Sequence, residues 1–195
     1  MLSAIILAAG SSVRMGDANK LLLPFKNKTV VEIVVENIIA AGIDEVIVVL
    51  GYQATQVKNV LQHLPVCFVS NADYKKGITT SIQYGVSIAT GNGYMICLAD
   101  MVKISSAEYK SLRDFFENKY LLNHSCICIP VFNSQRGNPV IFSSSYKEAI
   151  LQCSYMDGCK KIVEGNKENL FVLEMSTNNV LTDIDSKDDY EKLFL

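Results

Sequence analysis

Residues 5–16 of the chain read Ile-Ile-Leu-Ala-Ala-Gly-Ser-Ser-Val-Arg-Met-Gly, and Lys20 follows the last glycine by four positions. The apolar run over residues 4–9 ends in small residues, and one arginine and one lysine come soon after it. That order predicts a buried strand whose carboxyl end opens onto a phosphate-binding loop. An ordinary tight turn after a first strand is the alternative interpretation.

The residue types of this loop suit an anion. Gly10 and Gly16 allow the backbone to approach a phosphate closely, and the small Ser11 and Ser12 leave backbone N–H groups exposed. Two cations complete the loop: a forked guanidinium at Arg14 and a movable ammonium at Lys20.

Two well-known phosphate loops are excluded here. A Walker motif requires Gly-Lys-Ser/Thr after a glycine and four residues, and no such run follows Gly10. The dinucleotide fingerprint G-x-G-x-x-G is also absent, because Gly10 and Gly16 are too far apart. The loop is therefore a phosphate-type loop of another kind.

The composition indicates one packed domain over residues 1–195. Hydrophobic residues make up 49% of the chain, and 18 basic against 20 acidic residues give a net charge of −2. This balance argues against a general nucleic-acid binder or membrane-surface binder, which needs a clustered positive field. We expect no signal peptide and no membrane span, hence a cytoplasmic protein.

The cysteines and histidines offer weak metal signals. The six cysteines include no C-x-x-C pair, and Cys126 and Cys128 would share one strand face. A metal or redox pair is one interpretation, and buried free thiols are the favoured one. His63 and His124 lack partner spacing, so the sequence predicts no zinc site.

Strand-like and helix-like segments alternate along the first 130 residues, as in βαβ units. We predict strands over residues 4–8, 45–50, 66–69, 94–99 and 126–131, and helices over 30–41, 53–64, 79–89 and 105–117. Near-continuous apolar strands indicate a sheet buried on both faces. The predicted fold class is α/β: a Rossmann-like, doubly wound, mostly parallel sheet with helices on both faces.

The second part of the chain departs from this alternation. We predict an extended ribbon over residues 136–142 and helices over 145–152, 157–164 and 186–193. These segments should form a lobe over the sheet and not an independent domain.

Carboxylates follow two of the predicted segments. Asp100 ends a strand at the edge where ligands gather in such sheets, so we predict a magnesium ligand there. A helix cap or a solvated turn is the alternative. Asp183 or Asp185, near the last helix, could reach the same ion, although such pairs are usually helix starts.

Two polar segments complete the candidate site. Thr79, Thr80 and Ser81 open a helix after Gly77 and offer donors to a base or a phosphate, or simply cap the helix. Residues 136–139, Arg-Gly-Asn-Pro, could clamp an acceptor anion or turn a hairpin.

Several segments stand in a fixed order along nearly the whole chain: Leu7-Ala8-Ala9-Gly10-Ser11-Ser12-x-Arg14-Met15-Gly16, Lys20-Leu21-Leu22-Leu23-Pro24, Val48-Val49-Leu50-Gly51, Asn71, Gly77-x-x-x-Ser81, Leu98-Ala99-Asp100, Gly137-x-Pro139-Val140 and Asp183-Ile184-Asp185. In this order they resemble the nucleotidyltransferase superfamily that includes the molybdenum-cofactor cytidylyltransferases. The first segment is the most specific of the set.

The resemblance implies an enzyme that moves a nucleotide from an NTP onto a phosphorylated acceptor and releases pyrophosphate. It implies three catalytic residues, Arg14, Lys20 and Asp100, and Mg²⁺ held by Asp100 and Asp185. It implies nucleotide contacts at Leu7, Ala8, Ala9, Gly10, Ser11, Ser12, Arg14, Lys20, Gly51, Asn71, Gly77, Thr80 and Ser81.

The resemblance also suggests the substrates. Guanylyltransferase relatives usually carry Gly where this chain has Ala9, which favours CTP and molybdopterin. Residues 1–130 would then bind the NTP, and residues 131–195 would bind the acceptor through Arg136, Asn138 and Lys160 and add a closing helix. A molybdoenzyme or its maturation factor is the protein partner that the resemblance suggests.

The chain departs from the family pattern at three places. It has Asp100-Met101-Val102 for Asp-Gln-Pro and Gly137-Asn138-Pro139 for Gly-His-Pro, and its residues 155–160 match Gly-Asp-x-Gly-Ala-Arg poorly. The alternatives are therefore a guanylyltransferase, a sugar- or polyol-phosphate nucleotidyltransferase, and a non-catalytic accessory protein. An NAD-binding oxidoreductase fits the alternating fold but not the loop.

Overall fold

In the computed structural model, the residues described are 1–12, 15, 18–154, 156 and 158–192. The strands are β1 Leu2–Ala8, β2 Pro24–Phe25, β3 Lys28–Thr29, β4 Glu45–Leu50, β5 Cys67–Ser70, β6 Gly93–Leu98, β7 Ile127–Phe132, β8 Gln135–Arg136, β9 Val140–Ser143 and β10 Leu170–Glu174. The α-helices are α1 Val30–Ala40, α2 Ala54–Leu61, α3 Ile78–Ile88, α4 Ser106–Leu122, α5 Lys147–Leu151, α6 Lys160–Gly165 and α7 Lys187–Glu191.

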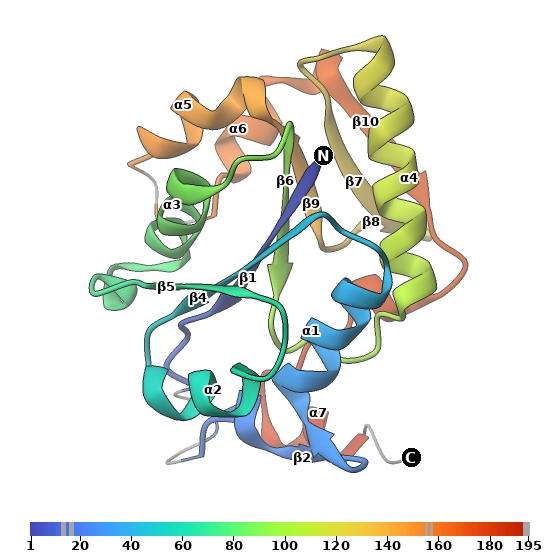
Figure 1. The fold of residues 1–195 in the computed structure, drawn as a ribbon. Helices are drawn as coiled ribbons and strands as arrows, with labels where there is room; N and C mark the ends of the chain where they lie inside the picture. Colours follow the sequence, from blue (N-terminus) through green and yellow to red (C-terminus); the bar gives the residue numbers. More distant parts are fainter. Residues whose placement is uncertain (13–14, 16–17, 155, 157, 193–195) are drawn as a thin grey trace.

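The strands form one large sheet with β1 at its centre (Figure 1). The order is β10-β7-β9-β6-β1-β4-β5, with β8 paired to β7. β1 is parallel to both β4 and β6, so the chain leaves β1 toward one edge and later returns on its other side. In open α/β sheets, ligands bind beyond the carboxyl ends of the strands at this reversal point.

Helices cover both faces of the sheet, as predicted. Alternate residues of β1 face two separate cores, because strand side chains point to opposite faces. Ala4 and Ile6 pack with α1 and α4, and Ile5 packs with residues of α3, α5 and α6. Figure 1 shows α1 and α4 on one side of the sheet and α3, α5 and α6 on the other. The Rossmann-like, mostly parallel α/β prediction is confirmed.

Helix starts follow the capping signals in the sequence. The Thr29 hydroxyl accepts a hydrogen bond from the Glu32 amide, and the Glu32 carboxylate accepts one in return from the Thr29 amide. Ser105 and Glu108 form the same reciprocal box at the start of α4. Each box satisfies backbone N–H groups that the helix cannot bond itself.

The structure differs from the sequence predictions in four places. β9 is antiparallel to both neighbours, β6 and β7, and thus inserts residues from the second half of the chain into the middle of the sheet. The edge strand β10 and the β2–β3 hairpin were not predicted, and α4 continues to Leu122, five residues beyond its predicted end. β10 escapes prediction because, as an edge strand, it is only partly buried.

None of the six cysteines, all of which lie among the described residues, forms a disulfide. Cys126 and Cys128 are buried, as expected of small hydrophobic residues. Cys67 is instead exposed, because β5 lies at an edge of the sheet. Within the part of the chain that the structure describes, no helix has both the length and the apolar character needed to cross a membrane.

Gly85 allows α3 to lie directly on the sheet. A methyl group at this position would collide with the Ile5 side chain and come within 3.1 Å of Val49 Cγ2. Gly85→Ala should therefore lower the free energy of unfolding by about 1–3 kcal/mol, the usual cost of overpacking, as measured by urea denaturation. Gly165→Ala, which has no neighbouring atom within 4 Å, is the matched control. Equal stability of the two variants would contradict this packing.

Candidate nucleotide and metal site

A cleft of about 520 Å³ opens at the carboxyl ends of β1 and β6. The residues that line it come from five separated segments of the chain. They are Leu7, Ala9, Gly10, Ser11, Lys20, Leu21, Tyr74, Lys75, Gly77, Ile78, Ser81, Leu98, Asp100, Asp183 and Asp185. The reversal point of the sheet is thus the position of the candidate site.

The loop after β1 lies at one wall of this cleft. Its Gly10 and Ser11 line the cleft, and Ala8 is buried in the core behind them. The Ser12 hydroxyl accepts a hydrogen bond from the Lys20 amide at 3.3 Å, which joins the two ends of the loop. Arg14 and Gly16, which were predicted to contribute to this loop, lie outside the described residues.

Three carboxylates meet at the base of the cleft. Asp100, Asp183 and Asp185 each offer an oxygen atom, and these atoms lie within 4.8 Å of one another. Lys20 is ion-paired with Asp100, and its Nζ lies 3.2 Å from Asp185 Oδ1. Burial lowers the pKa of Lys20, but the attraction of Asp100 and Asp185 outweighs burial and holds that pKa above its usual value.

Asp100 is the most buried member of this group. Its side chain is 9% exposed, and its Oδ1 atom has no hydrogen-bond partner among the residues that the structure describes. Burial raises the pKa of the Asp100 carboxyl, and the Lys20 ammonium opposes that shift. A buried carboxylate oxygen without a partner is energetically costly, and a positively charged ligand on this atom would remove that cost.

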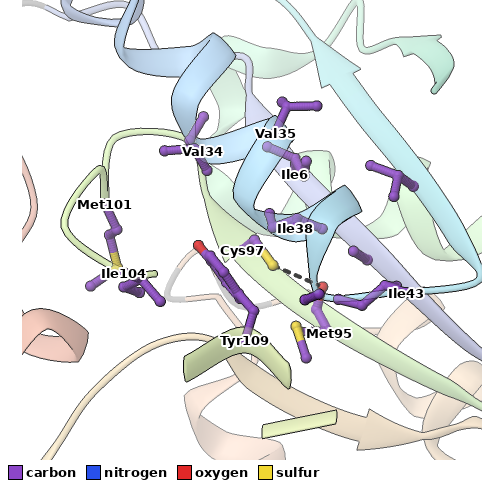
Figure 2. Close-up of a cluster of buried hydrophobic side chains, with 14 of the residues drawn as sticks. Ile6, Val34, Val35, Ile38, Ile43, Met95, Cys97, Met101, Ile104 and Tyr109 are labelled. Carbon is purple, nitrogen blue, oxygen red and sulfur yellow. Dashed lines mark hydrogen bonds between the residues drawn. The ribbon is translucent and has the colours of Figure 1, made fainter. Parts of the chain in front are cut away.

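The turn after Asp100 is held by apolar packing. Met101 and Val102, which stand where the family pattern has Gln and Pro, are 2% and 5% exposed. Figure 2 shows Met101 directly above Ile104, with Tyr109 next to them and the α1 residues Val34 and Ile38 in the same cluster. These contacts anchor the end of β6 to α1 and α4, so the turn keeps a fixed base without the rigid proline.

The carboxylate group fits a divalent cation. Mg²⁺ and similar ions prefer oxygen ligands and usually take one or two protein carboxylates together with substrate phosphates. Asp100 offers a buried unpartnered oxygen, and Asp183 and Asp185 offer two more oxygens within reach. The presence of both Asp183 and Asp185 leaves open which of them contacts the ion.

The start of α3 forms the opposite wall. Gly77 has a φ of 113°, a region that favours glycine, and both Gly77 and Ser81 line the cleft. Buried Asn71 donates hydrogen bonds of 2.9 Å to both Thr80 Oγ1 and Ser81 Oγ. Asn71, which does not itself line the cleft, therefore fixes the start of α3.

Gly51 also lies behind the cleft wall. A methyl group on it would meet Ala9 Cβ at 2.7 Å and Tyr74 Cβ at 2.8 Å. Gly51 thus permits close packing of the two segments that carry Ala9 and Tyr74. Among the described residues predicted to contact nucleotide, Ala8, Ser12, Gly51, Asn71 and Thr80 do not belong to the cleft lining, and they support residues that do.

A second cavity of about 340 Å³ adjoins the first, and the two share Ile78 and Leu98 as lining residues. All three predicted acceptor residues, Arg136, Asn138 and Lys160, line this cavity. Its other lining residues are mainly apolar: Ile82, Ile96, Ile129, Val140, Phe142 and Val163, with Gly137, Gly158 and Glu164. The structure thus brings the three predicted acceptor residues together in one largely apolar cavity, whose lining includes the two cations Arg136 and Lys160.

Backbone contacts connect this second cavity to the carboxylates. The Asn138 amide donates a 2.9 Å hydrogen bond to the Val180 carbonyl, three residues before Asp183. A methyl group on Gly137 would meet that same carbonyl oxygen at 2.5 Å, so only glycine permits this approach. The acceptor segment and the carboxylate segment therefore form one packed unit.

Glu108, the capping partner of Ser105, also holds Thr177 and Asn179, which lie a few residues before Asp183 and Asp185. Its carboxylate accepts hydrogen bonds from Thr177 Oγ1 at 2.6 Å and from Asn179 Nδ2 at 3.2 Å. Burial raises the pKa of Glu108, but the hydrogen bonds from Thr177, Ser105 and Asn179 outweigh burial and keep it below its usual value. The capping box was visible in the sequence, and its long-range partners had no local signal.

This lowered pKa predicts a pH-dependent loss of stability in Glu108→Gln. A depressed carboxyl pKa stabilises the fold above the unfolded-state pKa, and the effect disappears as the pH falls through the folded-state pKa. At pH 7 the variant should be less stable than wild type by about 1 kcal/mol, the scale of a helix cap. The difference should begin to shrink as the pH falls through the usual Glu pKa of about 4.3, and it should be lost below the depressed folded-state pKa.

Urea denaturation at a series of pH values measures this difference. Glu117→Gln, at an exposed position on the same helix, is the control. A Glu108→Gln penalty that persists unchanged at pH 3 would contradict the assigned role of the charge.

Comparison with known proteins places these features among nucleotide-transferring enzymes. The family model described as a MobA-like NTP transferase domain matches residues 4–170. Nicotine blue oxidoreductase from Paenarthrobacter nicotinovorans is 25% identical, over 98% of this chain and 95% of that protein. A 2-aminoethylphosphonate cytidylyltransferase from Lancefieldella rimae is 31% identical, over 51% of this chain and 43% of that protein.

Solved structures share the fold over nearly the whole chain. A nucleotidyl transferase from Methanothermobacter superimposes with a TM-score of 0.85 at 24% identity and covers 99% of this chain and 95% of its own. Rv0371c from Mycobacterium tuberculosis in complex with manganese gives a TM-score of 0.82 at 22% identity and covers 98% and 97%.

Proposed function

The chain belongs to the MobA-like NTP transferase family, and on that premise we propose that it transfers CMP from CTP to a phosphorylated acceptor with release of pyrophosphate. Molybdopterin is the acceptor that we propose. One observation carries the transferase proposal: Asp100 has a buried oxygen atom that lacks a hydrogen-bond partner among the described residues. Lys20 is ion-paired with the same carboxylate, and Asp183 and Asp185 lie close to it.

The difficulty in this reaction is to bring two polyanions together in line. An acceptor phosphate is already an anionic nucleophile at neutral pH, so the enzyme requires no general base. Asp100 and Asp185 would hold Mg²⁺, which when bound supplies charge that stabilises the α-phosphate during attack. Lys20, together with Arg14, would neutralise the pyrophosphate as it leaves, and positioning in the cleft would supply much of the remaining acceleration.

The preference for CTP rests on Ala9 and on a named relative. Ala9 lines the cleft, at a position where guanylyltransferase relatives usually carry glycine. The relative from Lancefieldella rimae is named a cytidylyltransferase. Gly77 and Ser81 would line the base and ribose from the start of α3. GTP is the alternative nucleotide.

The preference for molybdopterin rests on the resemblance to the molybdenum-cofactor cytidylyltransferases and on the apolar second cavity. Arg136, Asn138 and Lys160 would bind the anionic part of the acceptor, and the isoleucines and Phe142 would cover its ring system. A sugar or polyol phosphate would leave its hydroxyl groups against apolar walls, which disfavours that class. The 2-aminoethylphosphonate of the named relative is a smaller alternative acceptor.

A second candidate function is an oxidoreductase, because the relative from Paenarthrobacter nicotinovorans carries that name and matches nearly the whole chain. A hydride transfer has no need for three carboxylates around a lysine. NAD(P)H titration by fluorescence separates the two candidates. Saturable NAD(P)H binding without metal-dependent CTP binding would favour the oxidoreductase.

The transferase proposal predicts a large catalytic defect in Asp100→Asn. The variant keeps the shape of the side chain and removes the charge that would hold the ion, so several kcal/mol of transition-state stabilisation should be lost. We expect kcat/KM for pyrophosphate release from CTP and molybdopterin to fall by at least about 100-fold. Asp114→Asn on α4, away from the cleft lining, is the control. Wild-type turnover by Asp100→Asn would contradict the assignment.

The acceptor proposal predicts a selective effect of Arg136→Ala. Loss of a charge-assisted hydrogen bond should raise the KM for the acceptor by about 10-fold or more. The dissociation constant of CTP, measured by isothermal titration, should stay the same because Arg136 lines the second cavity and not the first. Lys167→Ala, an exposed charge beyond α6, is the control. Equal weakening of CTP and acceptor would contradict a separate acceptor cavity.

A further inference from the structure

Lys20 lies where two functions compete for it. As a cation of the proposed phosphate loop it should contact a triphosphate, and yet in the structure its ammonium engages two carboxylates of the candidate metal site. It is ion-paired with Asp100 and lies 3.2 Å from Asp185 Oδ1. The Lys20 side chain is 17% exposed, so this arrangement is a packed one and not a surface ion pair.

The contact places a positive charge beside a possible metal-ligand atom of Asp100. Lys20 engages Oδ2 of Asp100, while Oδ1 of the same carboxylate is buried and has no hydrogen-bond partner within the described part of the chain. A divalent ion on Oδ1 would therefore stand next to an ammonium in a poorly hydrated site, where like charges repel strongly. The same ion would also compete with Lys20 for Asp185, the second carboxylate on which the site depends.

From this geometry we propose that Lys20 is an internal counter-ion that keeps free divalent ions out of the site until a nucleoside triphosphate draws it away. The proposal rests on the proposed transferase function. A triphosphate carries about four negative charges and binds beside the loop, so it offers Lys20 a stronger partner than the carboxylates. Departure of the ammonium removes the competing positive charge from Asp100 and Asp185, so that the ion that accompanies the nucleotide can bind them.

The competition of Lys20 with the metal ion couples the binding of metal to the binding of nucleotide. Metal and nucleotide enter together, because each removes an obstacle to the other: the nucleotide removes Lys20, and the ion neutralises the carboxylates that repel the phosphates. By reciprocity, any factor by which nucleotide tightens metal binding is also the factor by which metal tightens nucleotide binding. Lys20 is thus a positioning residue for metal entry as well as a phosphate contact.

The test measures Mn²⁺ binding to the nucleotide-free protein by electron paramagnetic resonance. Wild type should bind Mn²⁺ weakly, and Lys20→Met should bind it at least tenfold more tightly because the competing charge is gone. Lys20→Arg keeps the charge and should stay weak. Lys58→Met, on the exposed side of α2, removes the same charge elsewhere and should match wild type.

Two further measurements make the result specific. A Lys20→Met/Asp185→Asn double variant should lose the gained affinity, which places the new Mn²⁺ at the carboxylates. The factor by which CTP tightens Mn²⁺ binding should be smaller in Lys20→Met than in wild type. Circular dichroism verifies that each variant is folded before titration.

The outcomes separate the two proposals. Equal Mn²⁺ affinities of nucleotide-free wild type and Lys20→Met overturn the counter-ion role, while CTP-dependent Mn²⁺ binding in the same samples leaves the transferase proposal standing. Absence of Mn²⁺ binding to wild type even with CTP overturns the transferase proposal and the counter-ion role together. A tenfold gain in Lys20→Met that depends on Asp185 supports the counter-ion role.

Discussion

The ion pair of Lys20 with Asp100 and Asp185 is the interaction on which the site depends. It joins the phosphate loop, the end of β6 and the last part of the chain, so residues 165 positions apart share one charge cluster. Three carboxylates within 4.8 Å repel one another and are stable together only beside a cation. The fold therefore places the Lys20 ammonium at the position where the proposed reaction would place a divalent ion.

Most of the central fold could be predicted from the sequence, because the patterns that specify its strands and helices involve residues close together in the chain. Apolar strands and helix caps such as Thr29–Glu32 and Ser105–Glu108 depend on residues a few positions apart. The insertion of β9 between β6 and β7 depends on contacts between Met95 and Ile141, which no local pattern encodes. The same holds for the hydrogen bonds from Thr177 and Asn179 to Glu108, which sequence reasoning did not anticipate.

The site could be predicted as a set of residues and only partly as a set of roles. The carboxylates, Lys20, Gly77 and Ser81 meet in one cleft beyond the carboxyl ends of β1 and β6, where ligands bind in such sheets. Asn71 and Gly51 belong to the segments of the resemblance but do not line the cleft. Asn71 holds Ser81 by a hydrogen bond, and Gly51 allows Ala9 to pack closely. Motif spacing identifies such residues without telling a ligand contact from a support.

The replacement of a polar, rigid turn after Asp100 by Met101-Val102 weighed toward a non-catalytic protein when only the sequence was considered. The packing changes that balance, because Met101 and Val102 are both buried in the core cluster that includes Ile104 and Tyr109, and Figure 2 shows Met101 beside Ile104. The turn holds the Asp100 carboxylate in a largely buried position, and one oxygen of that carboxylate has no hydrogen-bond partner in the described part of the chain. Such an atom destabilises the fold unless a ligand compensates it, which favours a site that still binds a cation.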